Sequence, residues 1–137
     1  MSQPPYPQQP PYAPVPMPPS DERMWGMFGH LSAIAATFVG LPFLGPLIVF
    51  LVFKDRSGFV RGHSAEALNM TISLIVYELV LGLVLGVFTL VTLGIGAIFF
   101  FVAWIPAVVF LVFTILAAVA ANRGEVYRYP LIFRLVR

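Results

Sequence analysis

One uncharged run, residues 79–122, constrains the fold of this chain more than any other feature of the sequence. As a single helix its roughly 44 residues would be about 66 Å long, twice the hydrocarbon thickness of a bilayer. The run therefore has to fold back, and residues 92–96 offer an uncharged turn with two glycines. The sequence predicts two long antiparallel membrane-spanning helices, over about 63–91 and 97–122.

The composition supports a membrane protein. Apolar residues form 59% of the chain and charged residues 10%, whereas a soluble domain carries about 25% charged residues. With 137 residues the chain has the length of one domain, so a larger core cannot hide this apolar surface. We therefore expect an all-α integral membrane protein surrounded by the lipid bilayer.

The basic residues indicate topology and exclude some partners. Most of the eight lie in residues 54–61 and from position 123 onward, beside the predicted spans. Nucleic-acid binding needs a broad basic face, so no nucleic-acid partner is expected. Positive loops favour the cytoplasm, which places both basic segments, and the C-terminus, on that side. The chain has no cysteine, which excludes disulfides and thiolate metal sites.

The segment before the two long spans is interrupted. Residues 40–46 hold two glycines and two prolines, which break a helix. We predict helices over about 21–39 and 44–53 that form a short hairpin, and this leaves the N-terminus cytoplasmic. One kinked span, with the N-terminus outside, is the alternative. Residues 1–20 contain nine prolines and are predicted to be a disordered tail.

Glu78 is a carboxylate near the middle of the predicted helix 63–91. A charge at the bilayer centre costs about 2.5–3.5 kcal/mol on insertion scales, so such residues are candidates for a functional site. Thr71, Gly82 and Gly86 share its helical face. Two interpretations stay open for this candidate intramembrane polar site. Protonated Glu78 donates a hydrogen bond across a helix seam, or it serves proton or cation transport.

The polar start of the same helix is a second candidate. His63, Glu66 and Asn69 are interpreted as helix-start capping and bundle packing, and Asn69, Ser73 and Tyr77 as a stripe that holds another helix. His30 is interpreted as a packing histidine. No metal site is predicted, because too few further ligands accompany the two histidines. No cofactor is expected either.

Four ordered blocks of sequence, within residues 21–32, 45–49, 63–69 and 121–130, carry a family resemblance. Together they resemble a family of small bacterial membrane proteins grouped as Tic-twenty-like, after a component of the chloroplast inner-envelope import machinery. The resemblance covers residues 21–137 and implies one helical domain in the bacterial cell membrane. The motif residues that it implies are His30, His63, Glu66, Asn69, Asn122, Arg123, Gly124, Tyr129 and Pro130. Met70 and Thr71 depart from it, because an aromatic residue and a glutamine are expected there.

The sequence predicts a function without catalysis. No histidine–acid pair flanks a plausible serine nucleophile, no elbow motif is present, and no phosphate-binding loop is present. The leading hypothesis is a non-enzymatic scaffold or accessory subunit of a membrane assembly, which associates with itself or with other membrane proteins. The alternative hypothesis is a transporter or channel-like component that uses Glu78.

Overall fold

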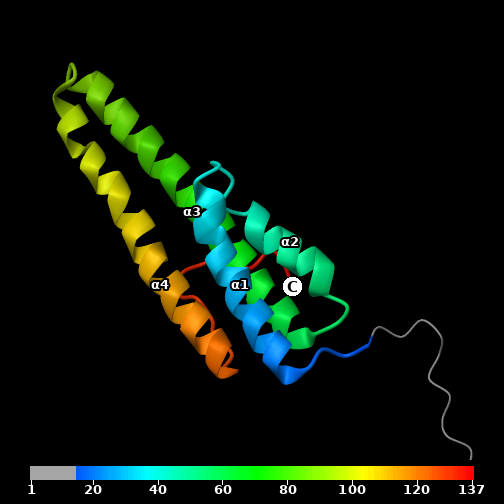
Figure 1. The fold of residues 1–137 in the computed structure, drawn as a ribbon. Coiled ribbons are helices and arrows are strands. Elements are labelled where there is room, and N and C mark those ends of the chain that lie inside the picture. Colours follow the sequence, from blue (N-terminus) through cyan, green and yellow to red (C-terminus); the bar gives the residue numbers. More distant parts are fainter. Residues whose placement is uncertain (1–14) are drawn as a thin grey trace, which may run out of the picture.

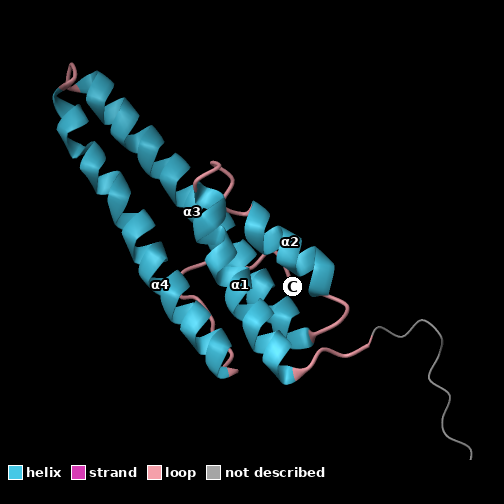
Figure 2. Cartoon of the chain, viewed as in Figure 1, coloured by secondary structure: helices cyan, strands magenta, loops and turns pink. Residues whose placement is uncertain are grey.

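The computed structural model describes residues 15–137, and all regular elements of this part are helices (Figures 1 and 2). They are α1 (Pro19–Thr37), α2 (Leu44–Phe53), α3 (Gly58–Val91), the 3₁₀-helix η1 (Ile95–Ala103) and α4 (Trp104–Arg123). The predicted all-α fold, with a short helical hairpin before two long apolar helices, is confirmed.

The predicted tail needs a correction at its end, and most of it lies outside the described residues. The prediction of disorder covered residues 1–20, but α1 already begins at Pro19. A proline fits the first turn of a helix because the N–H that it lacks would be unpaired there. Met17 precedes the helix, is buried, and packs with Phe53 and Val60.

The first apolar segment forms two helices rather than one kinked span. α1 ends at Thr37, two residues before the predicted end, because Gly40 adopts a left-handed conformation with φ 77°. α2 then packs closely on α1. A Cβ at Gly45 would lie 2.6 Å from the Cβ of Ser32, so this close approach requires glycine.

α3 begins at Gly58, five residues before the predicted start. Ser57 caps it, since its Oγ accepts a hydrogen bond from the backbone N–H of Val60 at 3.1 Å. The same Oγ donates to Oε1 of Glu22 at 2.6 Å. The beginnings of α1 and α3 therefore lie together, at the end of the bundle where α4 ends (Figure 1).

The last span differs from the single kinked helix predicted over 97–122. Ile95–Ala103 forms a 3₁₀-helix, and the α-helix starts only at Trp104. This start places Pro106 in the first turn of α4, where its missing N–H breaks no helical hydrogen bond. The proline thus sets where the α-helix begins, rather than bending a continuous one.

The α3–α4 hairpin projects well beyond α1 and α2 (Figure 1). Both Gly58–Val91 and Ile95–Arg123 are long and apolar enough to cross a membrane. In the projecting part most large side chains are exposed, and Leu93 at the turn is 95% exposed. The turn between α1 and α2 is also apolar, and its Phe38 is 90% exposed. Lipid has to cover these surfaces, because water would not solvate them favourably.

Candidate functional site

A chain of buried hydrogen bonds joins α1, α3 and the segment after α4. His30 is fully buried on α1, and its Nε2 lies 2.9 Å from Nδ1 of His63 on α3. The hydroxyl of Tyr129 lies 2.8 Å from Nδ1 of His30. His63 Nε2 lies 3.1 Å from the backbone oxygen of Glu125. The two histidines, 33 residues apart in sequence, thus form one polar core.

The hydrogen-bonding partners determine which ring nitrogen of each histidine carries the proton. The backbone oxygen of Glu125 can only accept, so His63 donates to it from Nε2 and its neutral ring accepts at Nδ1. His30 therefore donates from Nε2 and accepts from Tyr129 at Nδ1. Burial raises the pKa of the Tyr129 phenol, which keeps its hydroxyl protonated as a donor.

The segment after α4 folds back along α3, and we call residues 125–137 the C-terminal strap. It runs along α3 to Tyr77, whose hydroxyl donates to the backbone oxygen of Leu131 at 2.6 Å. Leu131 has a φ of 56°, and the chain reverses there, directly after Pro130. The backbone N–H of Phe133 then donates to Ser73 Oγ at 2.8 Å on the way back.

Asn69 holds the end of the strap. Its Oδ1 accepts from the backbone N–H groups of Leu135 and Val136, each at 2.8 Å, and its Nδ2 donates to the backbone oxygen of Val136 at 2.8 Å. Asn69 is 1% exposed. Its amide thus replaces, for this stretch of backbone, the partners that a neighbouring strand would supply.

Glu66 holds the middle of the strap. Its Oε1 pairs with Nε of Arg134 at 2.9 Å, and its Oε2 accepts from the backbone N–H of Tyr129 at 3.2 Å. Arg134 also donates to the backbone oxygen of Tyr129 at 2.9 Å, so the ion pair closes the loop of the strap.

These contacts correct two interpretations of the sequence. The stripe of Asn69, Ser73 and Tyr77 binds the backbone of the strap rather than another helix. His63 and Glu66 do not cap a helix start, because Ser57 caps α3. The stripe itself was visible in the sequence, but its partner was not, since the strap has no helical or alternating pattern.

The predicted intramembrane site does not assemble into one polar cluster. Thr71 donates to the backbone oxygens of its own helix, at Ala67 and Leu68. Glu78 has a buried Oε1 that finds no hydrogen-bond partner in residues 15–137. A Cβ added at Gly82 or Gly86 would have nothing within 4 Å. The glycines therefore mediate no close helix contact within this chain.

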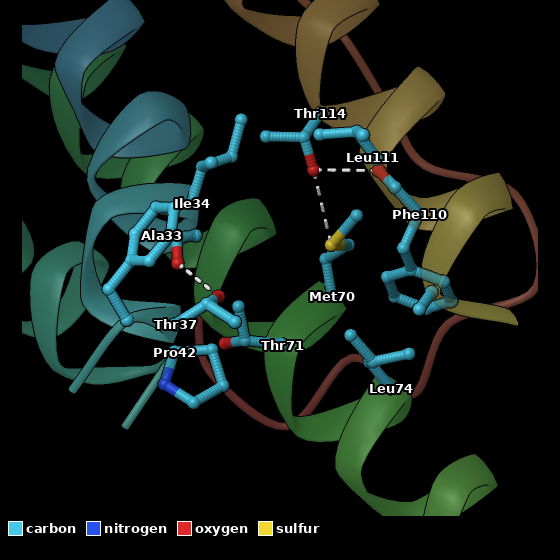
Figure 3. A pocket seen from close by; sticks show the side chains of 12 residues that line it. Ala33, Ile34, Thr37, Pro42, Met70, Thr71, Leu74, Phe110, Leu111 and Thr114 are labelled. Carbon is cyan, nitrogen blue, oxygen red and sulfur yellow. Dashed lines mark hydrogen bonds between the residues drawn. The ribbon is translucent and has the colours of Figure 1, made fainter. Parts of the chain in front are cut away.

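Thr71 instead lines an apolar cavity of about 220 Å³ between α1, α3 and α4, which Figure 3 shows from close by. Thr37 and Thr114 also line it, and each hydroxyl donates to a carbonyl of its own helix at 2.8 Å. With its threonine hydroxyls engaged, the cavity suits an apolar group rather than an ion.

The remaining motif residues mark the end of α4. Gly124 has a φ of 80° and terminates the helix, as a C-terminal glycine does. Asn122 and Arg123 are exposed just before it. Among the described residues no group of three or more histidine, cysteine or acidic side chains is arranged to hold a metal ion.

Comparison with known proteins assigns the chain to a different family from the one that its sequence blocks resemble. A family model described as the magnetosome magnetite crystal formation protein family (MamF/MmsF) matches residues 21–136. No curated protein and no solved structure matches the chain. The Tic-twenty-like assignment is therefore wrong. It depended on short polar blocks between apolar spans, and Met70 and Thr71 already differed from the residues that it expects. The chain belongs to the magnetosome magnetite crystal formation protein family.

Proposed function

We propose that this chain is a non-enzymatic scaffold of the magnetosome membrane, which supports magnetite crystal formation by organising membrane proteins rather than by binding the mineral. The link to magnetite crystal formation comes from the description of its family. The observation that carries the scaffold role is the projecting α3–α4 hairpin, whose glycine face at Gly82 and Gly86 is left open.

The distribution of carboxylates supports a role away from the mineral. Carboxylates are established ligands of iron, as in the di-iron carboxylate proteins. The turn between α3 and η1 carries no charged residue. Five of the six acidic residues lie in the elements at the opposite, arginine-rich end, and the sixth is Glu78. With that end in the cytoplasm, the far side of the membrane receives no carboxylate from this chain.

The glycine face supports association with a second copy of the chain. Small residues spaced four apart let two helices approach closely in lipid, where dispersion contacts drive association. α4 leaves this surface of α3 open, because nothing lies within 4 Å of a Cβ at either glycine. A second α3 helix would fill the space and cover apolar surface that the monomer exposes.

The test uses two differently tagged copies that are expressed together and purified through one tag. Replacing Gly82 and Gly86 with leucine is expected to reduce recovery of the second tag by about tenfold, because overpacking costs 1–3 kcal/mol. The control enlarges Val80 and Val84 to leucine, since both are exposed on another face of the same helix. Equal recovery from the glycine variant and the wild type would contradict self-association through this face.

Transport is a second candidate, and the buried, unpartnered Oε1 of Glu78 favours it. On this proposal, vesicles that contain the protein show proton or cation flux, and Glu78→Gln abolishes it because the neutral amide cannot exchange a proton and offers no negative charge to a cation. Glu125→Gln, on the exposed strap, serves as the control. Flux that persists unchanged in Glu78→Gln removes this residue from any transport mechanism.

A further inference from the structure

A cleft of about 430 Å³ lies between the first turns of α3 and the C-terminal strap. It is separate from the open glycine face, which lies in the projecting half of α3. Its lining combines basic side chains with glycines that leave room at its wall: Arg128, Arg134, Arg137, Gly58 and Gly62.

The cleft carries an excess of positive charge. Arg134 is neutralised by Glu66 at 2.9 Å. Arg128 and Arg137 have no ion-pair partner among residues 15–137. The carboxylate of Glu66 is engaged twice, by Arg134 and by the backbone N–H of Tyr129, so it opposes a bound anion only weakly. Two unpaired guanidinium groups therefore border one concave site.

Apolar side chains form another part of the lining of the cleft. Phe59, Val126 and Val136 also line it, and Val126 is 80% exposed. A free phosphate ion would gain nothing from these side chains, whereas a molecule with both a phosphate and hydrocarbon would contact both parts. Guanidinium groups match phosphate oxygens in two-pronged hydrogen bonds.

We propose that this cleft binds the phosphate headgroup of an anionic phospholipid, with Arg128 and Arg137 on the phosphate and the apolar lining residues beside the first carbons of the lipid. The site lies next to the loop of residues 54–57, at the end where the positive charges of the chain gather. Basic pockets beside membrane spans are suited to such lipids. This site is independent of the proposed self-association and would hold in a monomer.

The test uses the full chain in nanodiscs of phosphatidylcholine and phosphatidylglycerol, with retained lipids counted by native mass spectrometry. The wild type is expected to retain phosphatidylglycerol preferentially. Arg128→Gln combined with Arg137→Gln is expected to lower that preference by about tenfold. Arg56→Gln combined with Arg123→Gln is the matched control, because it removes two arginines that do not line the cleft. Circular dichroism verifies that both double variants are folded.

Two results would overturn the proposal. If both double variants lose the preference equally, total positive charge rather than the cleft selects the lipid. If millimolar inorganic phosphate displaces phosphatidylglycerol, and also raises the melting temperature in pure phosphatidylcholine nanodiscs, the ligand is free phosphate. Loss of preference in the cleft variant alone, without competition by phosphate, supports the headgroup site.

Discussion

Replacing Asn69 with leucine is expected to release the end of the C-terminal strap from α3. Leucine has the same branching as asparagine but removes all three hydrogen bonds to Leu135 and Val136. Each backbone group left without a partner costs about 1–3 kcal/mol where it stays buried, so the strap opens rather than remain docked. An opening that is easier by about 3 kcal/mol exposes the segment on the order of 100-fold more often.

Trypsin measures this opening directly, because Arg134 lies in the strap just before the residues that Asn69 holds. In the leucine variant, cleavage after Arg134 is expected to accelerate strongly, with the released C-terminal fragment followed by mass spectrometry. Asn122→Leu makes the same chemical change at an exposed position and is expected to leave the rate unchanged. Equal cleavage rates for the Asn69 variant and the wild type would show that this amide does not hold the strap.

The parts of the fold that the sequence predicts well are those that the bilayer dictates. The uncharged run 79–122 had to form two spans, because one helix of that length does not fit the hydrocarbon layer. The prolines and glycines of residues 40–46 likewise had to interrupt a helix, and α2 has the predicted bounds Leu44–Phe53. The predicted bounds are wrong where a capping residue determines where a helix begins. Ser57 caps α3, so this helix begins closer to the N-terminus than predicted.

The site was less accessible to sequence reasoning because its contacts are distant along the chain. Tyr129 meets His30 across 99 residues, and Asn69 meets Val136 across 67. The strap has no periodic pattern to predict its path, since it forms no helix or strand. Glu78 was predicted as a candidate site because it lies within a membrane span. The polar groups that form the most hydrogen bonds between distant segments lie instead in the first half of α3 and in the strap.

The hydrogen bonds of the two histidines determine the tautomer of each ring. Each neutral imidazole offers one donor and one acceptor, and the chain uses both on His30 and on His63. Both rings therefore carry their proton on Nε2. Nitrogen-15 spectra of the folded protein at neutral pH are expected to show this tautomer for both residues. A ring protonated on Nδ1 alone would contradict the order derived from the carbonyl of Glu125.

His30→Leu is expected to lower the free energy of unfolding by about 2–5 kcal/mol, because it leaves Nδ1 of His63 and the hydroxyl of Tyr129 buried without partners. Tyr129→Phe removes one of these orphaned groups. Combined with His30→Leu, it should therefore be less destabilising than the sum of the two single changes. Thermal unfolding in detergent measures the cycle, and Tyr127→Phe is the control, since Tyr127 contacts the ring of Tyr129 but takes no part in the hydrogen bonds of His30. Strict additivity would show that the His30–Tyr129 bond contributes nothing to folding.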